Sequence, residues 1–69
     1  MEDQELMELA RKVSLDLFNE GKAMGQVYHC YEDEDILRFF GGLTKEEVIV
    51  KVTEQEQLFA DYFDDIANA

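Results

Sequence analysis

Four consecutive acidic residues, Glu32-Asp33-Glu34-Asp35, have the chemistry of a calcium site. An EF-hand loop, however, spaces its ligands alternately along the chain and has glycine at its sixth position. Here Ile36 and Leu37 follow the acids directly. We therefore expect the acids to lie at the start of a short helix, where negative charge favours the helix dipole, and we predict no metal site and no cofactor.

His29 and Cys30 are the only histidine and the only cysteine in the chain. A zinc site needs four suitable ligands, and a single cysteine cannot form an internal disulfide. Adjacent side chains in a strand also point in opposite directions, which disfavours a Cys-His nucleophile pair. We expect these two residues to be half-buried without a catalytic function. The chain is therefore predicted not to be an enzyme.

The last third of the chain carries a row of carboxylates. No basic residue follows Lys51. If this part is helical, Glu54, Asp61 and Asp65 share one face at i, i+7 and i+11, opposite an apolar face that includes Phe59. The row spans about 16 Å, at 1.5 Å per residue. One DNA strand presents several phosphates over that length, so the carboxylates can substitute for a phosphate row.

The acids at positions 32–35 and those at positions 54–65 together form the predicted site for a positively charged partner. Charge runs are often only solvated faces, but such faces usually mix both signs, and this one does not. The predicted partner-binding residues are Glu32, Asp33, Glu34, Asp35, Glu54, Asp61, Asp64 and Asp65.

The overall charge agrees with that prediction. The chain has 17 Asp and Glu against 6 Lys and Arg, a formal net charge of −11. Such a charge attracts cations and repels phosphates, which excludes nucleic acid and anionic membranes as favoured direct partners. The chain begins Met1-Glu2-Asp3, so we expect no signal sequence, and it has no apolar run of membrane-spanning length. We expect a cytoplasmic protein, in agreement with its lone cysteine.

With 69 residues, the chain is predicted to form a single domain over 1–69. Five phenylalanines and three tyrosines distinguish it from a disordered acidic tail. A core of this size usually requires a disulfide, a metal or a second subunit for stability. Homodimer formation is therefore expected.

Two long helices are expected to position the acids. The first covers about 3–20 and can end at Gly21. Its apolar positions follow helical spacing, and we expect them to face the core. These positions are Leu6, Leu9, Ala10, Val13 and Leu17.

The second long helix is expected over about 44–67, because Thr44 and Glu47 match a capping box. Its apolar stripe is interrupted at Gln55 and Glu56, which predicts a bend or break near residue 54. The β-branched run within 47–53 also fits a strand. The stripe consists of Val48, Val52, Phe59, Tyr62, Phe63 and Ile66.

The middle of the chain fits two structures. Residues 26–31 resemble a short strand by composition and a helical turn by spacing. Asp33 or Asp35 can cap a short helix that Gly41-Gly42 ends. The predicted fold is mainly α, a small bundle of two long helices with a short helix or strand between them. The alternative is an α+β fold with strands near 26–31 and 47–53.

In size, charge and acidic patches such as Glu32-Asp33-Glu34-Asp35, the chain resembles the small acidic proteins with which bacteriophages occupy the DNA-binding surfaces of host proteins. An inhibitor of the HU-type nucleoid-associated protein is one of these. The resemblance lies in character, without a shared motif, and assigns no individual residue. It implies a DNA mimic that acts in the host takeover by a phage, in the host cytoplasm.

The sequence therefore predicts a non-catalytic DNA mimic that binds a basic DNA-binding protein and blocks its access to nucleic acid. Charge would steer the encounter, and a few aromatic side chains would hold the complex. The alternative is an acidic protein-protein adaptor that works through an apolar groove between helices.

Overall fold

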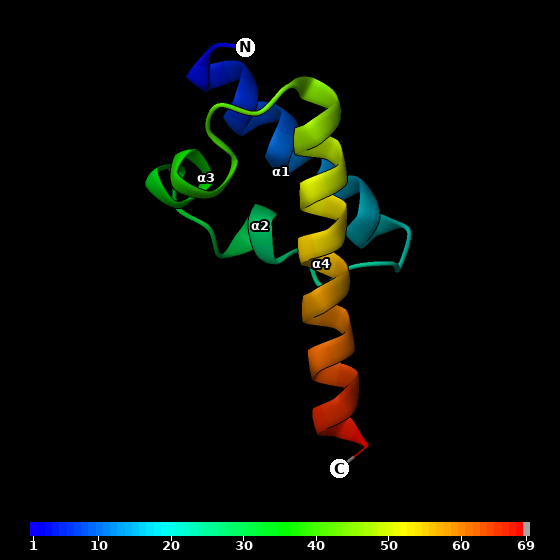
Figure 1. Cartoon of the computed structure of the whole chain (residues 1–69). Helices are drawn as coiled ribbons and strands as arrows, with labels where there is room; N and C mark the ends of the chain where they lie inside the picture. The colour runs from blue at the N-terminus through cyan, green and yellow to red at the C-terminus, as the bar shows by residue number, and fades with distance from the viewer. Residues whose placement is uncertain (69) are drawn as a thin grey trace.

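The computed structural model describes residues 1–68, which form four helices. These are α1 (Asp3–Asn19), α2 (Gln26–His29), α3 (Asp33–Phe40) and α4 (Lys45–Ala67), and α1 contacts each of the other three. Figure 1 shows α1 and α4 crossing, with the two short helices beside them. The mainly α prediction is confirmed. The α+β alternative is wrong, because α2 occupies most of 26–31 and α4 includes all of 47–53.

The β-branched run in α4 is helical because its start and its packing both favour a helix. Thr44 and Glu47 form the expected capping box: the Glu47 N–H donates to Thr44 Oγ1 over 3.3 Å, and the Thr44 N–H donates to Glu47 Oε1 over 3.1 Å. Val48 and Val52, four residues apart, are fully buried on one side. Packing of this stripe overrides the modest strand preference of valine.

The buried line of α1 differs from the expected one. Leu6, Ala10 and Ser14 are buried, whereas Leu9, Val13 and Leu17 are half-buried beside them. Because α1 contacts three helices, its line of closest approach passes through small side chains that allow short interhelical distances. The core consists of Leu6, Ala10, Val27, Ile36, Phe40, Val48 and Val52.

Both predicted glycine stops are observed. After α1, Gly21 has φ 74°, and the N–H groups of Gly21 and Lys22 donate to the carbonyls of Phe18 and Leu17, which is the Schellman arrangement. After α3, the chain leaves the helix at Gly41, where a Cβ would collide with the Leu37 carbonyl oxygen. These stops let the chain reverse within a few residues.

The N-cap residue of α3 was predicted incorrectly. Glu32, rather than Asp33 or Asp35, occupies the N-cap position. Asp35 lies three residues later, where its Oδ2 accepts the Glu32 N–H over 3.4 Å. The N-cap therefore lies one position before the first candidate, α3 begins at Asp33, and Asp35 acts as the reciprocal acceptor of a capping box.

The second half of α4 extends beyond the rest of the molecule (Figure 1). The predicted break near residue 54 is absent: α4 is one uninterrupted helix from Lys45 to Ala67, and Figure 1 shows it without a sharp kink. Its projection contributes to the elongated shape, with extents of 41, 21 and 18 Å. Among residues 1–68, no helix is both long and apolar enough to cross a membrane.

Candidate functional site

The acids at the start of α3 are partly neutralised by neighbouring cations. Asp33 pairs with Arg11 at 2.7 Å, and Asp35 lies 3.7 Å from Arg38. Arg11 also donates to the Tyr31 carbonyl over 3.2 Å, which fixes its guanidinium beside the cluster. Of the four predicted binding carboxylates here, Asp33 links α3 to α1, and Asp35 is paired within α3. The local negative charge is smaller than the sequence indicates.

Four acids on α4, Glu54, Asp61, Asp64 and Asp65, are exposed. Within residues 1–68, no ion pair involves Glu54, Asp61, Asp64 or Asp65. Because α4 is continuous, helix geometry places these four carboxylates along one side, and we call them the acidic face. Gln57 lies on the same side and donates to Asp61 over 2.9 Å. Most of the predicted α4 site thus forms one row of a single sign.

The predicted apolar stripe of α4 is covered only in its first half. Phe59 is half-buried against Tyr31, with ring centroids 6.4 Å apart, and the stripe beyond it is exposed. Tyr62 is 61% exposed, Phe63 39% and Ile66 54%. We call Leu58, Phe59, Tyr62, Phe63 and Ile66 the apolar face. The predicted stripe is therefore buried at Val48 and Val52 but exposed at its last three members.

The core stripe of α4 continues through a charged residue. Glu56 follows Val48 and Val52 at four-residue spacing and is fully buried. Its Oε1 accepts the Ser14 hydroxyl over 2.6 Å and the Val27 N–H over 2.9 Å. Its Oε2 accepts the N–H groups of Gly25 and Gln26 over 3.1 and 3.3 Å. The carboxylate therefore ties α1, α2 and α4 together.

Sequence reasoning missed this cluster because it treated Glu56 as an interruption. Two signals were available: the spacing of Glu56 from Val48 and Val52, and the spacing of Ser14 from Leu6 and Ala10. Both residues continue buried lines and so must face each other or another buried partner. Ser14 also accepts the Tyr28 N–H over 3.1 Å. Fully hydrogen-bonded and inaccessible to solvent, the pair is suited to holding the fold rather than to reacting with a substrate.

His29 and Cys30 are exposed, not half-buried as expected. The reason is that α2 is a single turn whose buried residue is Val27, so the end of the turn faces outward. The His29 ring packs edge-on against Phe18 and Tyr28, at centroid distances of 5.4 and 4.8 Å. Within residues 1–68, no group of three or more His, Cys, Asp or Glu side chains is arranged to hold a metal ion.

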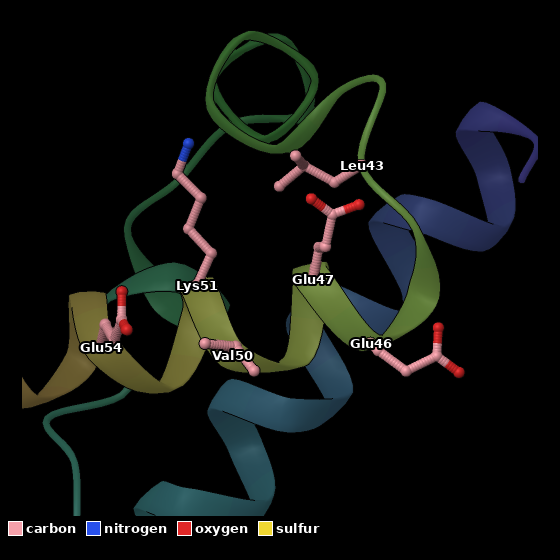
Figure 2. A pocket seen from close by; sticks show the side chains of 6 residues that line it. All are labelled: Leu43, Glu46, Glu47, Val50, Lys51 and Glu54. Carbon is pink, nitrogen blue, oxygen red and sulfur yellow. The ribbon is translucent and has the colours of Figure 1, made fainter.

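An open hollow of about 410 Å³ lies between the first half of α4 and the loop that leads into it. Figure 2 shows Glu47 and Lys51 rising from α4 towards α3 and Leu43. The Lys51 Nζ donates to the Phe39 carbonyl over 2.7 Å, so its charge is engaged at the end of α3. No Ser, Thr, Cys or His side chain lines the hollow. It is lined by Leu43, Glu46, Glu47, Val50, Lys51 and Glu54.

Comparison of the chain with protein-family models, with curated proteins and with solved structures finds no match.

Proposed function

We propose that this protein is a non-catalytic binding protein that occupies the basic, nucleic-acid-binding surface of a DNA-binding protein. The observation that carries the proposal is the acidic face of α4. Its carboxylates are all exposed, lie on a helix that extends beyond the fold, and have no cation after Lys51. A protein surface that binds a row of phosphates carries cations in a row, and the carboxylates of α4 are spaced so that they could pair with such cations.

The dimensions and the charge of the acidic face support this assignment. From Glu54 to Asp65 the helix axis advances about 16 Å, which corresponds to several phosphates of one DNA strand. The net charge of −11 adds a field that draws in a positively charged protein and orients it before contact. The acids at the start of α3 add less, since Asp33 and Asp35 are paired with arginines.

We infer the class of partner from the resemblance of this chain, in size and charge, to the small acidic DNA mimics of bacteriophages. The phage-encoded mimics with this character bind host DNA-binding proteins, and an HU-type nucleoid-associated protein is the partner that we propose to test first. A phage origin and action in the host cytoplasm belong to the same proposal.

A competition assay tests the proposed function. Fluorescence anisotropy would follow the release of labelled duplex DNA from an HU-type protein as the acidic protein is added. Neutralising the acidic face, with Glu54→Gln, Asp61→Asn, Asp64→Asn and Asp65→Asn, should weaken competition by at least about tenfold, since rows of exposed charge act together. The matched control removes four carboxylates from the start of α1, with Glu2→Gln, Asp3→Asn, Glu5→Gln and Glu8→Gln.

The control distinguishes a localised site from a general field. It lowers the negative charge by the same amount but leaves the acidic face intact, so competition should weaken much less. Equal losses in the two variants would mean that net charge alone acts, and no specific face could then be assigned. Failure of the unmodified protein to displace DNA would refute the proposed function for this class of partner.

The hollow in Figure 2 favours a second candidate, an adaptor that seats an apolar side chain of another protein. Leu43 and Val50 form its apolar surface, and Val50 is 55% exposed. The double substitution Leu43→Ser and Val50→Ser should abolish such binding and leave DNA competition unchanged. If it removes competition instead, the acidic face is not the working surface.

A further inference from the structure

Four of the five residues of the apolar face of α4 are exposed, and none of the five is charged. Leu58, Tyr62 and Ile66 are each more than half exposed, and Phe63 lies beside them with its ring 5.7 Å from that of Tyr62. The same stripe is buried nearer the start of the helix, at Val48 and Val52. The exposed part therefore continues a surface that already packs against another helix. It extends past α1, which covers the buried part.

We propose that this apolar face packs against the same face of a second copy of the chain, with the two α4 helices antiparallel. The interface would be formed by residues 57–67 of each protomer. It would be isologous, which means that the same set of residues from each protomer forms the two sides of the contact. It does not depend on the proposed function, since the acidic face and the apolar face lie on different sides of α4.

The distribution of charge favours a second copy as the occupant. The five residues of the apolar face are all uncharged, so this face provides nothing to recognise a basic partner, and the carboxylates lie on the adjoining side of the helix, with Asp65 at the edge. The net charge of −11 repels an anionic membrane, which is charged over its whole surface. It also repels a second copy, but there the contact itself is between uncharged side chains, so this repulsion weakens the dimer and is screened by salt. A second copy offers an equally apolar, uncharged surface of the same length, and its own acidic face would remain directed outward.

The antiparallel direction follows from electrostatics. The last turns of α4 combine Asp61, Asp64 and Asp65 with the negative end of the helix dipole. Parallel pairing would place two such ends side by side, whereas antiparallel pairing separates them and puts each beside the earlier, less acidic turns of the partner. The folded parts of the two protomers would then lie at opposite ends of the dimer.

The exposed area sets the expected strength of the dimer. At roughly 150–250 Å² for a whole aromatic side chain, the apolar face offers on the order of 400 Å² per protomer. Pairing would remove on the order of 800 Å² in total, which is below the standard range of about 1,200–2,000 Å² for stable complexes. We therefore expect a reversible dimer that dissociates in the micromolar range. Because the core is small, burial of apolar area between two copies would add stability that one chain lacks.

Sedimentation equilibrium of the full chain tests the interface. Between about 1 and 200 µM, the unmodified protein should change from monomer to dimer. The variant Phe63→Ser with Ile66→Ser should weaken the association by at least about tenfold. Because both positions are exposed, circular dichroism should show the helix content of the fold retained. Val50→Ser is the matched control, since it removes an apolar side chain that is 55% exposed on the same helix, away from this interface.

A monomer throughout that concentration range would overturn the proposal, as would a dimer that the double substitution leaves unchanged. Direction is tested by oxidising Ala67→Cys in a Cys30→Ser background. Parallel helices would place the two thiols together and form a disulfide dimer, which would contradict the antiparallel arrangement. The variant with a neutralised acidic face should still dimerise. An unmodified protein that competes with DNA but stays monomeric would refute this inference alone.

Discussion

Glu56 is the residue on which three helices depend. Its carboxylate accepts four hydrogen bonds, three of them from backbone N–H groups at the start of α2. A carboxylate offers acceptors at both oxygens, whereas an amide would turn an NH₂ group towards at least one of these donors. The buried position is therefore specific for an acid, even though the chain has acids in excess everywhere else.

The first prediction concerns Glu56→Gln. The substitution should lower the free energy of unfolding by about 2–4 kcal/mol, since it leaves buried donors without an acceptor. The small core supplies little more than that, so the variant should be largely unfolded at 37 °C. Chemical denaturation followed by circular dichroism measures the effect. Glu54→Gln, at an exposed position two residues away, should change stability by less than about 0.5 kcal/mol. Comparable losses in the two variants would contradict the assignment.

Tyr31 gives the second prediction, which concerns pH. Burial raises the pKa of its phenol above the ordinary value of 10.0, and the nearby Asp35 and Glu56 raise it further, while a hydrogen bond from Gln55 lowers it. The folded state therefore holds the phenolic proton more tightly than the unfolded state does. This contribution to stability is complete below pH 10 and is lost as the pH rises above it.

Tyr31→Phe isolates that contribution, since it keeps the ring and removes the titrating group. Urea denaturation at several values from pH 9 to pH 11 should show a steeper loss of stability in the unmodified protein than in the variant. Parallel curves would show that Tyr31 contributes nothing to the alkaline limit.

At the scale of elements, the turn between α1 and α2 places the N–H groups of Gly25 and of the start of α2 within hydrogen-bonding distance of Glu56. Gly21 is the residue that permits the reversal, because its φ of 74° is in the left-handed region. No atom lies within 4 Å of the site that a Cβ would occupy, so substitution there would strain only the backbone. A substitution at Gly21 therefore tests the cost of the backbone conformation without a change in side-chain packing.

The third prediction is that Gly21→Ala lowers the free energy of unfolding by about 1 kcal/mol, the usual penalty for a left-handed residue with a Cβ. Thermal unfolding of the variant measures it. Lys22→Ala, the adjacent exposed residue, is the control and should have little effect. An unchanged melting temperature for Gly21→Ala would mean that the turn adopts another conformation at no cost.

At the scale of the whole molecule, charge acts in two opposite ways. The six cations cannot balance 17 acids, and Arg11, Lys22 and Arg38 already lie in ion pairs. The surplus repels itself within the folded chain and attracts a basic partner. Salt screens both effects over about 10 Å at 0.1 M. Stability and partner affinity should therefore respond to salt in opposite directions.

The fourth prediction is that NaCl, raised from about 10 to about 200 mM at fixed protein concentration, increases the melting temperature by a few degrees. The variant with a neutralised acidic face should gain less, because it has less repulsion to screen. A melting temperature that falls on adding salt would show that ion pairs such as Arg11–Asp33 outweigh repulsion.

The affinity for a basic partner should fall over the same range of salt. We expect at least a tenfold loss, since the proposed interface relies on exposed charge. Titration calorimetry or anisotropy with the HU-type protein measures this fifth prediction. An affinity independent of salt would favour the apolar adaptor instead.

Local patterns in the sequence determined the helices. The capping box at Thr44, the Gly21 stop after α1 and the valines at four-residue spacing depend on residues close together in the chain, and all are found as expected. Net charge and the absence of cations after Lys51 are likewise properties of composition. None of these needs knowledge of which helix lies beside which.

Only the tertiary structure decided where each helical face lies. An apolar stripe predicts which face of a helix can be buried, but it does not predict how much of that face another helix contacts. The length of α1 and its crossing with α4 determine that burial ends near Phe59, so that Tyr62 is exposed. The position of an acid in the sequence likewise does not predict which groups surround it in the fold. Glu56 is buried because three donors of α2 converge on it, and Asp33 is neutralised because Arg11, 22 residues earlier, lies 2.7 Å away. Burial and pairing depend on contacts between distant segments, which no local spacing specifies.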